Sequence, residues 1–237
     1  MAAINDNLQA VAARIRAAAL AAGRDPSAVR LLGVTKTVGP VAIREACAGG
    51  LRSFGENYVQ EAIDKQAVLK ACTDMPRIEW HLIGPLQSNK TRVAAACFDW
   101  VHTIDREKVA RRLSEARAPD APPLNVLIQV NVSSEATKSG VPMAEVAGLA
   151  RLVAQLPRLR LRGMMAIPEA TADMNLQLDR FRSVRELFDT LNDQGFKLDT
   201  LSMGMSQDLE SAVAEGSTMV RIGTAIFGER TKAKAAA

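Results

Sequence analysis

Eight short apolar runs alternate along this chain with segments of helical spacing, and this alternation limits the possible folds more than any other feature. The runs cover residues 31–35, 53–57, 79–84, 100–104, 125–132, 159–167, 200–205 and 219–227. Strands that alternate with helices pair in parallel through right-handed crossovers. Eight such units within 237 residues predict an α/β fold, a closed (β/α)8 TIM barrel, as a single domain over residues 1–237.

A doubly wound open sheet is the competing architecture for such an alternation. It would carry a glycine-rich GxGxxG turn after its first strand, whereas this chain has the sequence KTVGP at residues 36–40. The segments of helical spacing cover residues 41–48, 58–71, 90–96, 106–116, 143–155, 176–194 and 207–214. We also expect an amphipathic helix at about residues 2–22 and a frayed tail at residues 231–237.

Composition argues against several classes of function. Aromatic residues make up only 4% of the chain and its charges are mixed, with a net charge of +4, so we expect no nucleic-acid partner. Two histidines and three dispersed cysteines predict no metal site and indicate reduced thiols in a cytoplasmic protein. No run approaches the length of a membrane span, and the first segment lacks the apolar core of a signal peptide.

Lys36 ends the first apolar run, at the end of the strand where a barrel carries its functional groups. Burial disfavours the charged form of an amine, and a neutral lysine is a nucleophile that can form a Schiff base with an aldehyde. The alternative is that Lys36 extends from the strand end into solvent, as most lysines do. Lys36 alone favours that alternative, so the interpretation depends on the other strand ends.

The ends of the seventh and eighth runs have the composition of a phosphate site. Ser206 precedes the predicted helix at residues 207–214, and as an N-cap it would lie beside free amides that attract anions. Gly223 and Thr224 follow in the eighth run, and barrel phosphate sites commonly use the loops after strands 7 and 8. A capped helix and a packing glycine are the structural alternative.

Arg221 strengthens the case for a ligand. Alternation along its strand places Arg221 on the same face as Gly223, which in a barrel can be the face toward the lumen. A guanidinium there stays charged and needs partners. Either a structural carboxylate or an atom of a ligand could satisfy it.

Five motifs run through most of the chain: VTKT at 34–37, FGENYVQE at 54–61, WHLIGPLQSNK at 80–90, MGMS at 203–206 and VRIGTAIFG at 220–228. Together they resemble the YggS/PROSC family of pyridoxal 5′-phosphate (PLP) homeostasis proteins. That family is similar to the N-terminal barrel of alanine racemase, so the resemblance implies a PLP fold type III-like barrel, here without the C-terminal β-domain of the racemase. Residues 168–178 carry no motif that matches.

The resemblance assigns roles to single residues. Lys36 matches the lysine that forms the internal aldimine with PLP, and Ser206, Gly223 and Thr224 match positions that hold the phosphate. Arg221 matches the arginine that faces the pyridine nitrogen.

Two further residues complete the predicted cofactor site. Asn57 matches a residue that lines the cofactor pocket. Met165, near the end of the sixth run, is a further candidate contact to the ring, although methionines there can simply fill the core.

The predicted function is reversible binding of PLP, with buffering or delivery of the cofactor to PLP-dependent apo-enzymes and little or no catalysis. An arginine donates to the pyridine nitrogen without protonating it, which leaves the ring a poor electron sink. Racemisation also needs a second base opposite Lys36, and the racemases take a tyrosine from their second domain for this role. We expect a monomer, because no second domain is evident in the sequence.

Two alternatives stay open from the sequence. The first is a racemase-like enzyme that uses Tyr58, His81 or a partner subunit as the second base. The second is a barrel for another phosphorylated metabolite, in which Lys36 is a simple phosphate contact. Whether the protein is an enzyme at all therefore stays open at this point.

Overall fold

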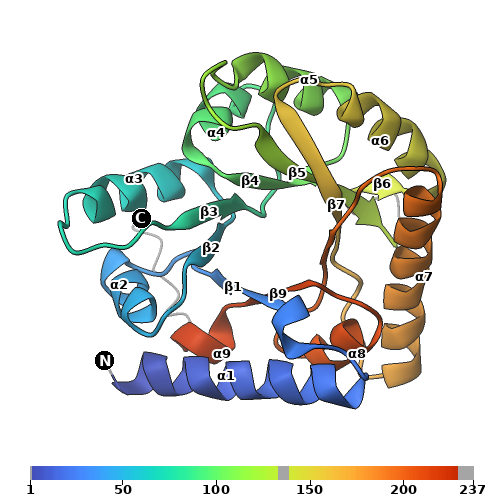
Figure 1. Ribbon diagram of the computed structural model, residues 1–237. Coiled ribbons are helices and arrows are strands. Elements are labelled where there is room, and N and C mark those ends of the chain that lie inside the picture. The colour runs from blue at the N-terminus through green and yellow to red at the C-terminus, as the bar shows by residue number, and fades with distance from the viewer. Residues whose placement is uncertain (1, 133–138, 229–237) are drawn as a thin grey trace, which may run out of the picture.

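Eight parallel strands close into a barrel in the computed structural model, which describes residues 2–132 and 139–228 (Figure 1). Around the ring lie β1 (Arg30–Val34), β2 (Ser53–Glu56), β3 (Glu79–Leu82), β4 (Trp100–Ile104), β5 (Leu124–Asn131), β7 (Leu159–Ala166), β8 (Thr200–Ser202) and β9 (Met219–Ile222). Parallel pairing of β9 with β1, and of β4 with β5, completes the closure. The predicted barrel is confirmed, whereas the predicted tail at 231–237 lies outside the described residues.

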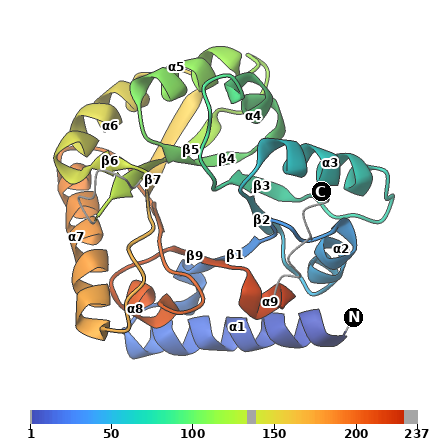
Figure 2. The same ribbon diagram turned by 180° about the vertical axis from the view of Figure 1, so that it is seen from behind.

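Helices surround the barrel on its outer side (Figures 1 and 2). They are α1 (Ala2–Ala21), α2 (Pro40–Ala48), α3 (Val59–Lys70), α4 (Thr91–Cys97), α5 (Glu107–Ala116), α6 (Val146–Ala154), α7 (Met174–Asp193), α8 (Leu209–Ala214) and α9 (Thr224–Phe227). Two single turns of 3₁₀ helix, Pro26–Ala28 and Met143–Glu145, precede β1 and α6. None of these helices is long and apolar enough to cross a membrane, as far as the described residues go.

Helix α1 packs against helices of both the first and the last units of the barrel. It packs along α2, α8 and α9, beside the pair formed by β1 and β9 (Figure 1). Its apolar face buries Leu8, Val11 and Ile15. Because β1 and β9 are neighbours, the first and last units of the chain form one wall of the barrel.

Two elements differ from the sequence prediction. The run 219–227 was expected as one strand, but β9 ends at Ile222 and α9 begins at Thr224. The chain turns there because the amides of Phe227 and Gly228 bond the carbonyls of Gly223 and Thr224, at 3.0 and 2.9 Å. A short strand that was not predicted, β6 (Val141–Pro142), extends the sheet at the end of β5.

The strands bury both of their faces. Residues that point outward, such as Phe54, Leu82 and Val101, pack under the helices in the main core. Alternation along the strands turns the intervening residues into the lumen. Two small apolar clusters fill part of it: Leu32, Val34, Ile83 and Met219 in one, and Trp100, Leu127 and Met165 in the other.

Candidate functional site

A cavity of about 650 Å³ lies at the C-terminal ends of the strands. Six of the seven residues that the sequence predicted for a cofactor line it, namely Lys36, Asn57, Ser206, Arg221, Gly223 and Thr224. They come from four different strand ends, as the functional residues of a barrel do. The fold therefore brings together groups that are up to 188 positions apart in the sequence.

The segment that carries Lys36 is held by charged side chains on both sides of the lysine. On one side, Thr35 donates its hydroxyl to Glu56 Oε1 at 2.6 Å and its carbonyl accepts from Lys65 Nζ at 2.6 Å. On the other, the amide of Thr37 bonds Glu61 Oε1 at 2.5 Å. Thr37 has a φ of 64°, a left-handed conformation that non-glycine residues adopt only where their surroundings impose it.

Lys65 links the two carboxylates of this network. Its amine lies 2.8 Å from Glu56 Oε1 and 2.6 Å from Glu61 Oε1. Burial raises the pKa of the Glu56 carboxyl, and the hydrogen bonds from Lys65 and Thr35 oppose that shift. Removing one partner of such a pair would leave a charge buried without compensation. The network thus fixes the backbone from which the half-buried Lys36 extends at the cavity wall.

Asn57 reaches the cavity because the neighbouring strand has a glycine beside it. Asn57 follows β2, and Gly84 follows β3. A Cβ atom at Gly84 would lie 2.1 Å from the Asn57 carbonyl oxygen and 2.6 Å from its Cα. Only glycine permits this approach of the two backbones.

The loop after β8 presents Ser206 in a different way from the one predicted. The N-cap of α8 is Asp208, and its carboxylate turns back to accept from the amide of Met205 at 2.5 Å. The prediction that Ser206 caps the helix is therefore wrong, because Asp208 occupies that position. Within the described part of the chain the Ser206 hydroxyl bonds no protein group, and the same is true of the exposed Thr224 hydroxyl.

Arg221 forms part of the cavity wall and is only 4% exposed. Its Nη1 donates to the carbonyl and the hydroxyl of Ser202 at 2.5 and 2.8 Å, and its Nη2 donates to the Ala166 carbonyl at 2.9 Å. No carboxylate among the described residues lies within ion-pair distance of it, so the structural carboxylate considered from the sequence is not found. Burial lowers the pKa of Arg221 to about 10, which leaves the guanidinium charged at neutral pH.

Met165 does not reach the cavity. It is fully buried and packs against Trp100 and Leu127 inside the barrel. Strand β7 continues to Ala166, so the residues that reach the cavity from this strand follow it, beginning with Ile167 and Pro168. Pro168 begins the range 168–178, where the sequence offered no motif, and Ile167 lies directly before it.

Sequence reasoning also missed Arg14 of α1. Arg14 lines the cavity, bonds the Ser206 carbonyl at 3.1 Å and pairs with Glu210. Nothing in the local sequence distinguishes it from other charged residues of an amphipathic helix. Only the packing of α1 on α8 brings it to the site.

The two candidates for a second base lie elsewhere. Tyr58 is 62% exposed and is not part of the cavity lining. His81 is fully buried within the barrel, where its ring bonds His102 and Glu79 at 2.9 and 3.1 Å. Neither side chain lines the cavity that Lys36 lines.

Comparison with known proteins agrees with this geometry. The family model for the alanine racemase N-terminal domain matches residues 6–231. The chain is 59% identical over 230 residues to the pyridoxal phosphate homeostasis protein of Pseudomonas aeruginosa, covering 97% of each chain. It is 52% identical over 231 residues to the protein of the same name from Escherichia coli K12, covering 98% of each.

Solved structures show the same fold. PipY of Synechococcus elongatus, determined with PLP bound, superposes with a TM-score of 0.81 at 37% identity, covering 95% of this chain and 100% of PipY. An alanine racemase from Clostridium difficile superposes with a TM-score of 0.77 at 13% identity. This second likeness spans 98% of this chain but only 58% of the racemase, and it shows the fold alone.

Proposed function

Because the chain belongs to the alanine racemase N-terminal domain family and to the pyridoxal phosphate homeostasis proteins within it, as its motifs predicted, we propose that it binds pyridoxal 5′-phosphate and serves in the intracellular homeostasis of this cofactor. Lys36 and Arg221 line the same cavity at the barrel mouth, and this observation carries the proposal. An amine and a permanently charged donor are what an aldehyde and a ring nitrogen of one ligand require.

The residues of the cavity fit the cofactor. Lys36 supplies the amine that condenses with the aldehyde, with loss of one water molecule. Ser206 and Thr224 offer hydroxyls, and Gly223 leaves room for the phosphate near the backbone. Arg221 pairs in register with Leu32, four residues before Lys36, so its backbone lies deeper in the barrel than that of the lysine.

Buffering or delivery of the cofactor, with little or no catalysis, follows from the same site. Arg221 cannot give up its proton at neutral pH, so it would bond the ring nitrogen as a donor without protonating it. Neither Tyr58 nor His81 lines the cavity, so the racemase-like alternative has no second base among these candidates.

Borohydride reduction followed by peptide mass spectrometry tests the proposal. After incubation with PLP, the protein should show an absorbance band near the border of the visible range. Borohydride should abolish this band and leave one reduced adduct, located on Lys36. Lys36→Ala should remove both signals, and Lys108→Ala, at an exposed lysine outside the cavity lining, should keep them. An adduct spread over surface lysines, or none, would contradict the proposal; binding without an adduct would favour the phosphorylated-metabolite alternative.

The finer parts of the proposal concern partners and location. We propose a cytoplasmic monomer that passes PLP to apo-enzymes; its three cysteines are unbridged, as in a reducing compartment. Light scattering should give a mass near 25.5 kDa. Mixing the loaded protein with a PLP-dependent apo-enzyme, in the presence of a phosphatase that destroys free PLP, should restore that enzyme. Failure to do so would exclude direct delivery, and a doubled mass would exclude the monomer.

A further inference from the structure

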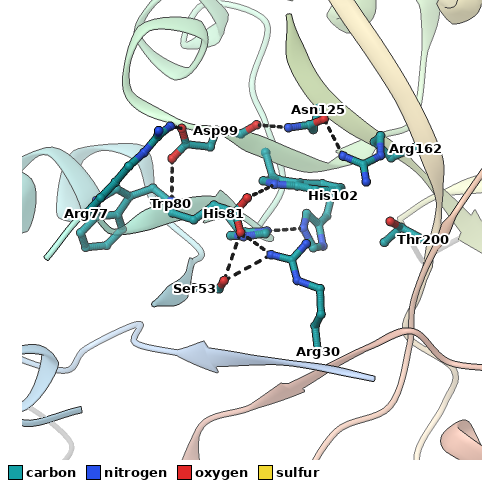
Figure 3. Close-up of polar contacts among 12 residues, drawn as sticks. Arg30, Ser53, Arg77, Trp80, His81, Asp99, His102, Asn125, Arg162 and Thr200 are labelled. Carbon is teal, nitrogen blue, oxygen red and sulfur yellow. Dashed lines mark hydrogen bonds and ion pairs between the residues drawn. The ribbon is translucent and has the colours of Figure 1, made fainter. Parts of the chain in front are cut away.

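A line of buried hydrogen bonds leaves Arg221 and crosses the lumen away from the cavity. The Arg221 guanidinium donates to Ser202 Oγ at 2.8 Å, and Ser202 Oγ lies 3.1 Å from His102 Nδ1. His102 Nε2 lies 2.9 Å from His81 Nδ1, and His81 Nε2 lies 3.1 Å from Glu79 Oε2. Figure 3 shows the two histidine rings meeting inside the barrel. Ser202 and both histidines are completely buried.

Glu79, at the start of β3, forms the far end of this line. It accepts from Trp100 Nε1 at 2.7 Å and from the Ser53 hydroxyl at 3.1 Å, and it pairs with Arg30. Although burial alone would raise it, the pKa of Glu79 lies well below its usual range because of the bond from His81 and these other donors. Glu79 is therefore a carboxylate that can only accept hydrogen bonds.

The two ends determine where every proton in the line must lie. Burial lowers the pKa of His81, and that of His102 further, so both rings are neutral at neutral pH. His81 must then donate from Nε2 to Glu79 and accept at Nδ1 from His102 Nε2–H. His102 in turn accepts at Nδ1 from the Ser202 hydroxyl, whose oxygen accepts from Arg221. Every bond donates in the same direction, from the guanidinium to the carboxylate.

We propose that Glu79, His81, His102 and Ser202 form a relay of positioning residues that fixes Arg221 at the cavity and turns acceptor dipoles toward it from the opposite end of the barrel. Arg221 forms no ion pair with a carboxylate among the described residues, and Asp208 of the cavity wall acts on its charge only from beyond ion-pair distance. The aligned dipoles of the neutral groups extend the influence of Glu79 to it as well. The relay holds the position of the guanidinium, which can only donate, at the cavity wall, so a ligand atom that meets it there must accept. Its effect on cofactor binding rests on the proposed function, whereas its protonation pattern does not.

The protonation pattern can be measured without any cofactor. The chain contains only two histidines, so the side-chain ¹⁵N–¹H correlation spectrum of the labelled protein holds two ring systems. We expect both to be neutral at pH 7.5, with the proton on Nε2 and a bare Nδ1. A proton on Nδ1 of either ring, or a doubly protonated ring, would overturn the relay whether or not the protein binds PLP.

Variants test whether the relay acts on the cavity. In the unaltered protein, PLP should shift the ring ¹⁵N signals of both histidines. Ser202→Ala cuts the line beside Arg221, so these shifts should vanish and PLP should bind about tenfold more weakly. Ser53→Ala removes one donor to Glu79 but spares the line, and both responses should persist. If the shifts and the affinity are unaltered in Ser202→Ala, the line of hydrogen bonds only fills the lumen and does not act on the cavity.

Glu79→Gln is the second variant, and it tests the far end of the barrel. It keeps an acceptor and removes the charge, so the histidine signals should respond to PLP by less than in the unaltered protein. A response of full size would show that Glu79 has no part in positioning Arg221. If the unaltered protein bound no PLP at all, the proposed function would be wrong. The measurement of the histidine tautomers would still test the relay.

Discussion

At the N-terminal end of the barrel Glu79, Arg30 and Trp100 satisfy one another's polar groups, whereas at the C-terminal end Ser206 and Thr224 leave their hydroxyls to a cavity. Both ends belong to the same strands, yet one is filled by its own side chains and the other is left open. The comparison teaches that the groups that stabilise this fold and the groups that bind lie mainly at opposite ends of the barrel axis. Substitutions at the filled end should cost mainly folding free energy, and substitutions at the open end mainly affinity, with the line from Glu79 to Arg221 as the one proposed link between the two ends.

The largest loss of stability should follow Trp100→Ala at the filled end. Trp100 is 1% exposed, its ring stacks on His81, and the guanidinium carbon of Arg162 lies 4.7 Å from the ring centroid. We expect a loss of about 3–5 kcal/mol in the free energy of unfolding, measured in urea. The folded fraction should still form the PLP adduct on Lys36. Trp100→Phe should lose less, and an adduct lost at unchanged stability would break the comparison.

Acidification should produce the next effect, also through the filled end. Burial lowers the pKa of His81 and His102 below the ordinary 6.5, so the unfolded chain takes up their protons first. Their contribution to stability is complete above pH 6.5 and falls below it, by up to about 1.4 kcal/mol per pH unit for each ring. Urea unfolding between pH 7.5 and 5.5 measures this slope. His102→Gln should flatten it; an equal slope in that variant would assign the effect to other groups.

Gly84→Ala lies at the open end but should affect both properties. The added Cβ would meet the Asn57 backbone at 2.1 Å, so one strand end must move. We expect a loss of about 1–3 kcal/mol in stability together with weaker PLP binding, because Asn57 shifts at the cavity wall. Equilibrium dialysis and urea unfolding measure the two effects. Gly148→Ala, where a Cβ would meet no atom, serves as the control.

Thr224→Ala should change stability least, by no more than about 0.5 kcal/mol, because the side chain is exposed. The substitution should instead weaken PLP binding, because it removes one hydroxyl from the proposed phosphate contacts. Thr224→Ser should retain most of that affinity. A large loss of stability in Thr224→Ala would show that the open end also supports the fold.

Much of the barrel could be predicted from the sequence, because buried parallel strands are short apolar runs and the order of the units follows the chain. The end of the first run also predicted Lys36 as a site residue, alternation along the eighth run added Arg221, and the family resemblance added Asn57. Met165 was misplaced because a strand end judged from hydrophobicity is uncertain by a residue or two. Strand β7 continues one residue past Met165, to Ala166, so Met165 stays inside the barrel and the lining from this strand begins at Ile167.

The remaining misses depend on contacts between distant segments. Arg14 reaches the cavity through the packing of one helix on another, and its own neighbours in sequence give no sign of it. The line from Glu79 to Arg221 joins four strands, and from the sequence His81 is only a candidate for a second base. Tertiary hydrogen bonds of this kind have no periodic pattern in a single sequence.

The pairing of β1 with β9 has a consequence for the order of events during synthesis. Lys36 leaves the ribosome 185 residues before Arg221 does. A growing chain therefore cannot close its barrel or assemble the pocket until β9 has emerged. Cofactor loading would then mark a closed barrel, and chains that stop before β9 would carry the reactive lysine without the groups that direct an aldehyde to it.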